Sequence, residues 1–228
     1  MIKKTRSSGL EYNMDKSLKR IVIAGNGENW KKEKIIYFCQ EADYIIAADN
    51  GLSILNRFNI TPDLIIGDLD SVSPTLLQHY PEVPIEKHPG KKDLTDSELS
   101  IQKAISMNPK EIILLAMTGN YFDHSYAAII NLFRNYQQGT EMKMVTSNSV
   151  IFPIFKKTTL LNLKGRRFSL FPMSRVQQFS ITGAEYQFSK DNLTMTDYSI
   201  SNIITEDKVE INFKKGRLFC VLFDAGFD

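Results

Sequence analysis

Cysteine, histidine and long hydrophobic runs are all scarce in this chain of 228 residues. Its two cysteines and three histidines do not have the ligand spacing of a zinc finger. Cys39 and Cys220 each lie in a short apolar run, which predicts two buried, reduced thiols rather than a disulfide. Apolar stretches such as residues 112–117 are far below the roughly 18 residues of a membrane span, and the N-terminus has no apolar leader. We therefore expect a cytoplasmic protein that does not cross a membrane.

The composition is that of a globular protein, with 43% hydrophobic and 24% charged residues, so disorder is excluded for most of the chain. The net charge of +2 is unevenly distributed. Residues 1–20 carry six Lys or Arg and two Asp or Glu, whereas residues 21–150 carry eleven and sixteen. A nucleic-acid-binding domain usually shows a basic stripe. The acidic main segment argues against nucleic acid as a partner and favours a metal site.

The pattern along the chain predicts a basic arm over residues 1–20, an α/β domain over 21–147 and a small β-sandwich over 148–228. In the α/β domain, continuous apolar runs alternate with amphipathic segments, which is typical of a mostly parallel sheet with helices on both faces. After about residue 150 the helical period gives way to alternating apolar residues punctuated by glycine. The predicted strands are 21–24, 44–48, 63–66, 83–85, 111–116 and 142–145, and the predicted helices are 31–40, 51–58, 73–79, 95–107 and 124–137.

Carboxylates follow most of these strands at the point where each one ends. Ligands of open α/β sheets bind outside the carboxyl ends of the strands, and four of the first five loops carry an acidic residue there. Asp68 and Asp70 stand two apart in an extended turn, where a cation between them would relieve their repulsion. Oxygen ligands of this kind suit Mg²⁺ bound together with substrate phosphates. The alternative for Asp70 is a capping role at the next helix.

The segment around residues 91–98 combines both signs of charge. Lys91 and Lys92 precede Asp93 and Asp96, and a complex of Mg²⁺ with a phosphate chain needs cations and anions together. Thr95 and Glu98 have the spacing of a capping box, so they also have a structural explanation. Asp123 and His124 follow the fifth strand, where His124 is a ligand contact rather than a general base. The Gly25-x-Gly27 pair is too short for a dinucleotide-binding signature.

Four segments, taken in order and spacing, resemble the thiamine pyrophosphokinase (thiamine diphosphokinase) family. They are Ala47-Ala48-Asp49-Asn50-Gly51, Pro62-Asp63-Leu64-Ile65-Ile66-Gly67-Asp68-Leu69-Asp70-Ser71, Lys92-Asp93-Leu94-Thr95-Asp96-Ser97-Glu98-Leu99, and Thr118-Gly119 through Asp123-His124. The resemblance covers about residues 20–225, since the β-rich tail is similar to the family's thiamine-binding domain. It implies transfer of a pyrophosphoryl group from ATP to the hydroxyl of thiamine, with Mg²⁺, giving thiamine diphosphate and AMP.

The resemblance also implies the site residues. Asp68, Asp70 and Asp96 become metal ligands, with Asp70 or Asp96 accepting the hydroxyl proton, and Ser201 and Asn202 lie near the thiamine pyrimidine. A homodimer is implied, with thiamine bound between the α/β domain and the partner's sandwich. Candidates for the nucleotide and its phosphates are Asp49, Asn50, Gly51, Lys91, Lys92, Asp93, Thr95, Gly119, Asp123 and His124.

The chain departs from the family pattern at Asn50, where the family often has Gly, and at Tyr121, where it often has Arg. Losing that Arg removes a bidentate phosphate donor, which bears on nucleotide preference and rate. Two alternatives remain. Residues 64–72 resemble the first motif of haloacid-dehalogenase phosphatases, with Asp68 as nucleophile, although no later Gly-Asp-x-x-x-Asp follows. A nucleotide or thiamine sensor without catalysis is the other.

Overall fold

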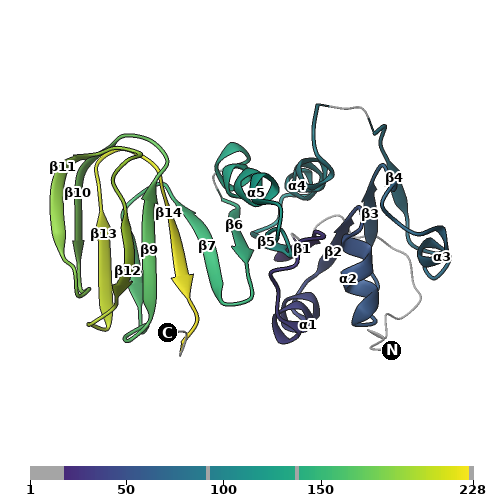
Figure 1. Ribbon diagram of the computed structural model, residues 1–228, viewed down its shortest axis with the longest axis horizontal. Coiled ribbons are helices and arrows are strands. Elements are labelled where there is room, and N and C mark those ends of the chain that lie inside the picture. The colour runs from purple at the N-terminus through teal and green to yellow at the C-terminus, as the bar shows by residue number, and fades with distance from the viewer. Residues whose placement is uncertain (1–17, 91–92, 137–138, 226–228) are drawn as a thin grey trace. The chain divides into compact units, whose positions relative to one another are not determined.

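The computed structural model describes residues 18–90, 93–136 and 139–225. The chain forms two compact units that meet in sequence between Ser147 and Asn148, and Figure 1 shows the elements of each. Most of the predicted basic arm, together with Lys91 and Lys92, lies outside the described residues.

The first unit is built on a parallel sheet with strand order β6-β5-β1-β2-β3-β4. Ile23 of β1 pairs with Ile46 on one side and Leu114 on the other, and all three side chains are fully buried. Strands covered on both faces need such continuous apolar runs. The strands are β1 (Arg20–Ala24), β2 (Tyr44–Ala48), β3 (Leu64–Gly67), β4 (Ile85–Lys87), β5 (Glu111–Leu115) and β6 (Glu141–Val145).

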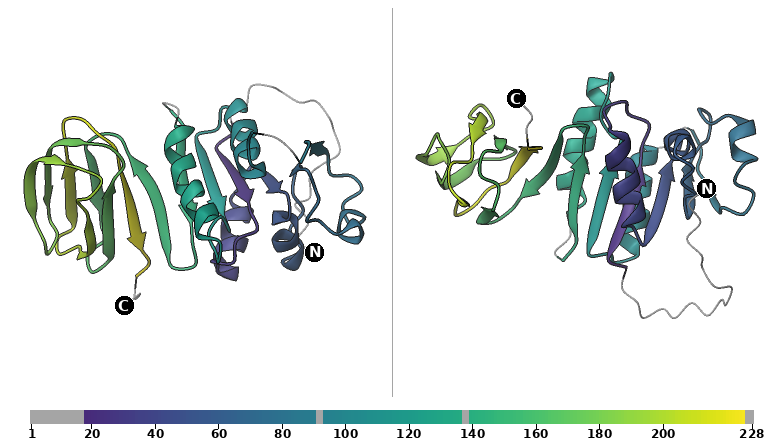
Figure 2. Two further views of the ribbon diagram at one scale, coloured as in Figure 1. Left: turned by 45° about the horizontal axis from the view of Figure 1, so that its top comes forward. Right: turned by 90° about the horizontal axis from the view of Figure 1, so that it is seen from below.

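Helices cover both faces of this sheet, α4 and α5 on one and α1 and α2 on the other, as Figures 1 and 2 show. In α1, Ile35 and Cys39 are buried one turn apart, so a single face of the helix packs inward. Strand β1 lies at the centre of the sheet, with β2 on one side of it and β5 on the other. The helices are α1 (Lys32–Gln40), α2 (Gly51–Arg57), α3 (Pro74–Leu77), α4 (Asp96–Ser106) and α5 (Phe122–Arg134).

Some boundaries differ from those that the sequence predicts. The fourth strand begins at Ile85, two residues later than expected, because Pro84 has no N–H to donate and only its carbonyl is used, by Ile65. The fifth helix begins at Phe122, earlier than expected. Asp123 therefore lies inside the first turn, where its carboxylate accepts from the His124 N–H, instead of capping the helix.

The second unit consists of antiparallel strands in two layers, with orders β12-β9-β14-β7 and β11-β10-β13-β8. Side chains from both layers meet in one apolar core that includes Phe168, Phe179 and Val209. This matches the predicted small all-β domain. Its strands are β7 (Ser149–Ile154), β8 (Thr158–Leu161), β9 (Arg167–Pro172), β10 (Val176–Thr182), β11 (Phe188–Leu193), β12 (Ser199–Ile203), β13 (Lys208–Asn212) and β14 (Leu218–Phe223).

Both cysteines are free and buried, as the sequence predicts. Burial raises the pKa of the Cys39 thiol to about 12, and it also raises the pKa of Cys220 in β14. Of the helices in the described part of the chain, none has the length and apolar character needed to cross a membrane.

Glu111 at the start of β5 ties three strands together, because it pairs with Arg20 of β1 at 2.5 Å and with Lys143 of β6. Burial raises the pKa of this carboxyl, but the hydrogen bonds and charges of Lys143 and Arg20 outweigh it, so the net pKa falls below 4.5. The stabilisation is therefore fully present above pH 4.5 and is lost as the pH falls through the lowered value.

Glu111→Gln is expected to lower the free energy of unfolding by about 1–2 kcal/mol at pH 7. The difference from wild type should shrink as the pH falls through the lowered pKa, because protonation then removes the charge of the wild-type carboxyl as well. Urea unfolding at pH 7 and at a series of decreasing pH values below 4.5 measures this change. An undiminished difference at the lower pH values would show that shape, not charge, carries the effect.

Candidate active site

The site lies at the carboxyl ends of the parallel strands, where the sheet order reverses. The loops after β1 and β5 leave adjacent strands in opposite directions, which opens the crevice that α/β sheets use for ligands. A pocket of about 610 Å³ occupies this place. Its walls come from the loop of residues 25–28, the end of β2, the start of α4, the loop of residues 116–121 and α5.

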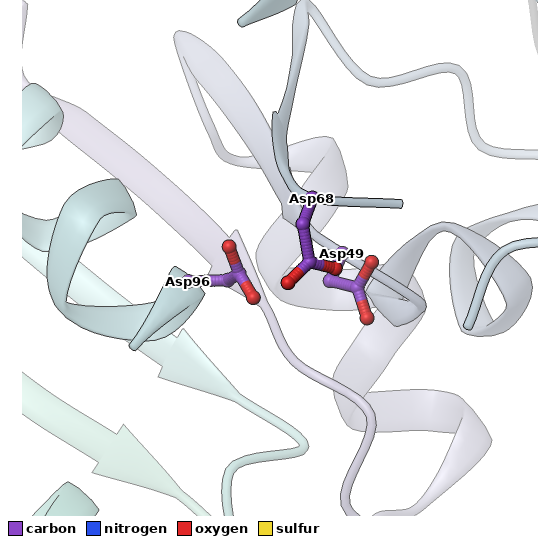
Figure 3. A group of neighbouring side chains, drawn as sticks. All are labelled: Asp49, Asp68 and Asp96. Atoms are coloured by element: carbon purple, nitrogen blue, oxygen red, sulfur yellow. The ribbon is translucent and has the colours of Figure 1, made fainter. Parts of the chain in front are cut away.

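Three carboxylates gather beside this pocket. Asp49 follows β2, Asp68 follows β3 and Asp96 is the first residue of α4. One oxygen from each lies within 4.8 Å of the others, and all three residues are partly buried. Figure 3 shows the three carboxylates close together, each contributed by a separate segment of the chain. The convergence of acidic strand ends predicted from the sequence is present for these residues.

The backbone between the strands is shaped to allow this approach. Asp49 has a left-handed φ of 47°, which turns its side chain back across the strand ends. Gly67 at φ 156° has almost no room above it: a β-carbon there would lie 3.1 Å from the Asp49 β-carbon and 3.3 Å from the Asp96 carboxyl carbon. Glycine at the end of β3 is therefore what lets two of the carboxylates meet over the strand.

Charge balance at this cluster points to a cation. The Ser71 hydroxyl donates to Asp49 Oδ2, but Asp49 Oδ1 is buried and no described residue gives it a hydrogen bond. A buried carboxylate oxygen without a donor is costly, and the two neighbouring carboxylates add repulsion. A hard divalent cation fits all three groups, because carboxylate oxygens are the ligands that Mg²⁺ prefers.

Asp70, which the sequence analysis placed among the metal ligands, lies outside this group of three carboxylates, and Asp49 lies within it. Leu69 has a φ of 65°, so the turn sends the following side chain outward, and Asp70 is exposed. It remains electrostatically close to Asp68. The charge of Asp68 and a hydrogen bond with it raise the pKa of Asp70.

The predicted nucleotide residues separate into those that line the pocket and those that do not. Asp49, Thr95, Gly119, Asp123 and His124 line it, as does the predicted metal ligand Asp96. Asn50 and Gly51 do not: Asn50 accepts from the Ser53 hydroxyl, and Gly51 is buried against β1. Asp93 is exposed outside the pocket wall. Among the described residues no Lys or Arg lines the pocket, and Lys91 and Lys92, predicted for the phosphates, lie beyond them.

The first turn of α4 is held by the predicted capping box. Thr95 Oγ1 accepts from the Glu98 N–H at 3.2 Å, and Glu98 Oε2 accepts from the Thr95 N–H at 2.9 Å. Glu98 also pairs with Arg134 of α5. These contacts fix the helix start that carries Asp96, so Thr95 has a structural role in addition to its place in the pocket wall.

In the second unit, the predicted thiamine residues differ in their surroundings. Ser201 is exposed on β12 at a bulge with φ 55°. Asn202 is fully buried, and its amide both accepts from the Tyr186 N–H at 3.0 Å and donates to the Tyr186 carbonyl at 2.8 Å. The Asn202 side chain therefore holds the backbone of Tyr186, whose ring is 63% exposed, and is not turned to solvent.

Two family models match the chain in sequence order. Residues 35–144 match the catalytic domain of thiamin pyrophosphokinase, and residues 156–218 match its vitamin B1 binding domain. The chain belongs to the thiamin pyrophosphokinase family. The resemblance seen in the sequence is thus confirmed, and the enzymatic activity is that of a thiamine diphosphokinase.

Relatives with this family name cover nearly the whole chain. A thiamine pyrophosphokinase of Bacillus subtilis (strain 168) is 23% identical over 206 residues, which are 88% of this chain and 96% of the relative. A crystal structure of the enzyme from Bacillus subtilis has a TM-score of 0.80 at 20% identity, covering 91% of this chain and all of that one. The yeast enzyme's structure gives 0.78 at 16%, covering 92% and 88%. These structures confirm the predicted fold class.

Other pocket residues of this family member were not predicted from the sequence. Met117 lines the wall and belongs to none of the quoted segments, and Ser97 lines it from within the third segment. Asn131 is buried on the pocket side of α5 and is 4% exposed. A signal existed for Asn131, since a polar residue with poor helix propensity stands on the buried face of an amphipathic helix, seven residues after His124.

Proposed function

We propose that this chain catalyses Mg²⁺-dependent transfer of the pyrophosphoryl group of ATP to the primary hydroxyl of thiamine, at the carboxylate cluster Asp49, Asp68 and Asp96. The observation that carries this proposal is the convergence of three carboxylates from β2, β3 and α4 beside a pocket at the switch point of the sheet. The family's activity identifies the reaction, and the carboxylate cluster is the place where we propose that it occurs.

Asp49, Asp68 and Asp96 would hold the metal, and Asp49 Oδ1 is the oxygen whose need for a partner the ion would meet. A bound Mg²⁺ neutralises phosphate charge and polarises the phosphorus that is attacked. This is important here because no Lys or Arg among the described residues lines the pocket. We infer a stronger dependence on metal than in a site with several basic side chains.

The protein's own residues then position the reactants. The thiamine hydroxyl attacks the β-phosphorus of ATP, the bond to the α-phosphate oxygen breaks, and AMP leaves. Because Asp96 is committed to the metal in this proposal, we assign the hydroxyl proton to Asp70, whose exposed carboxyl lies next to Asp68. Gly119, Asp123 and His124 line the pocket where the rest of the nucleotide would lie.

We also propose that the second unit binds thiamine and that the active enzyme is a homodimer with sites between subunits. Large apolar side chains are exposed on β12, in the segment before it and at Tyr186, which supports a covering surface from another molecule. They are Tyr186, Met195, Tyr198, Ile200 and Ile203. Light scattering is expected to give twice the chain mass of 26.0 kDa; a monomer that is fully active would contradict this part of the proposal.

The decisive experiment follows AMP and thiamine diphosphate together from ATP, Mg²⁺ and thiamine. We expect equal amounts of both products, with activity falling at least about 10²-fold in excess EDTA and returning when Mg²⁺ is restored. Free phosphate without thiamine diphosphate would favour the phosphatase alternative. Saturable thiamine binding without turnover would favour the sensor.

A further inference from the structure

One face of α5 forms a continuous wall of the pocket. His124, Ala127, Ala128 and Asn131 line it at spacings of three and four residues, so they share one side of the helix. Tyr121, just before the helix, is 74% exposed and marks the open end, whereas Asn131 is 4% exposed and marks the inner end. From His124 to Asn131 the helix rises about 10 Å, and the two alanines between them leave the space open.

The side chain of Asn131 lines the pocket and has no hydrogen-bond partner among the described residues, although the residue as a whole is only 4% exposed. The Asn131 backbone carbonyl accepts from the N–H of Asn135 at 3.3 Å and from its Nδ2 at 3.2 Å, but no described residue forms a hydrogen bond with the Asn131 side chain. Buried polar groups in folded proteins are almost always paired. Asparagine is also a poor helix former, so helix propensity does not explain its presence in the last turn of α5. A partner arriving through the pocket does.

The geometry of an amide limits that partner's chemistry. Its N–H donor and its carbonyl acceptor stand side by side, which complements an exocyclic amino group next to a ring nitrogen. Both adenine and the aminopyrimidine of thiamine carry this edge. The pocket that contains Asn131 also contains Asp49 and Asp96, which the proposed function gives to the phosphates of ATP. If the phosphates of ATP bind beside Asp49 and Asp96, the adenine base lies in the same pocket.

We propose that Asn131 binds the adenine of ATP through paired hydrogen bonds at the inner end of the pocket. This inference rests on the proposed function, because it takes ATP as the phosphoryl donor. It makes Asn131 a residue that determines the choice of nucleotide, since a base that lacks the amino group would leave the side-chain carbonyl of Asn131 unpaired in the complex.

The test compares Kd for ATP with Kd for purine riboside triphosphate, which lacks the 6-amino group, both measured with Mg²⁺ by calorimetry. We expect the wild-type protein to prefer ATP by roughly tenfold, and Asn131→Leu, of similar volume, to bind both equally. Asn135→Leu, one turn further along the helix and outside the pocket wall, should keep the wild-type ratio. An unchanged ratio in Asn131→Leu would overturn the inference.

A second variant guards against a folding defect. Asn131→Asp is nearly isosteric and removes the donor, so its carboxylate faces the ring nitrogen of adenine and the Kd for ATP should rise by about tenfold or more. The KM for thiamine should stay unchanged in both variants. A rise in the KM for thiamine with an unchanged Kd ratio would give the amide to thiamine instead. Absence of thiamine diphosphate with wild-type protein would contradict the proposed function alone, because the Kd ratio is measured without turnover.

Discussion

Asp49→Asn is expected to reduce kcat/KM for pyrophosphoryl transfer by about 10²- to 10³-fold without destabilising the protein. The amide removes one anionic ligand from the proposed metal site, where Asp68 and Asp96 remain. Asparagine accepts the left-handed backbone at this position at least as well as aspartate. It also relieves the repulsion within the cluster, so the metal-free variant should unfold at the same denaturant concentration as wild type or a higher one.

The measurement pairs steady-state kinetics over a range of Mg²⁺ with urea unfolding in EDTA. Glu82→Gln is the matched control, since it removes one acidic charge from an exposed position of the same unit and should change neither quantity. Wild-type kcat/KM in Asp49→Asn at low Mg²⁺ would remove Asp49 from the site. A large loss of stability would instead give its carboxylate a structural role.

Gly51→Ala is expected to destabilise the protein by about 3 kcal/mol or more. A β-carbon at this position would lie 2.0 Å from the carbonyl oxygen of Ala24 and 2.7 Å from its carbonyl carbon, so α2 must move away from β1. Helix propensity alone predicts the opposite sign, a gain of about 1 kcal/mol for alanine over glycine. Because Asp49 precedes this helix by two residues, the displacement should also lower activity in molecules that remain folded.

Urea unfolding and kinetics on Gly51→Ala check both effects. Gly165→Ala serves as the control: residue 165 has a φ of 82° and nothing within 4 Å of an added β-carbon, so it should cost only about 1–2 kcal/mol of backbone strain. If Gly51→Ala were stabilised, the close approach of α2 to β1 would not be a constraint on the fold. The packing of α2 against β1 therefore requires glycine at this position.

The sequence predicts the elements well where periodicity is strong and less well where local geometry decides. Every predicted strand of the α/β domain is present, and for β1, β2, β3 and β5 the reason is that apolar runs buried on both faces leave little alternative. The sequence places Asp49, Asp68, Asp70 and Asp96 at one edge of the sheet, but it does not show that Asp49 lies closer to Asp68 and Asp96 than Asp70 does. This difference depends on the left-handed φ values of Asp49 and Leu69, and non-glycine residues adopt that region too rarely to be expected from sequence.

The residues in the second unit show a similar division. A Ser-Asn pair can be recognised in the sequence. The sequence does not show that the Asn202 amide is hydrogen-bonded to the backbone of Tyr186, whereas Ser201 is exposed. That distinction depends on a bulge in β12, which shifts the register between Ser199 and Asn202. Asn131 was missed for a different reason: its helix was predicted, but a lone asparagine carries no motif.

The two buried thiols described above fall one in each compact unit, Cys39 in α1 and Cys220 in β14. A thiol that is buried and has a raised pKa reacts with alkylating reagents only when its surroundings open. The alkylation rate of each thiol therefore reports the rate at which its own unit opens. Labelling followed by peptide mass spectrometry would measure the opening of each unit separately, without adding a foreign probe. It would also show whether nucleotide or thiamine slows the opening of one unit more than that of the other.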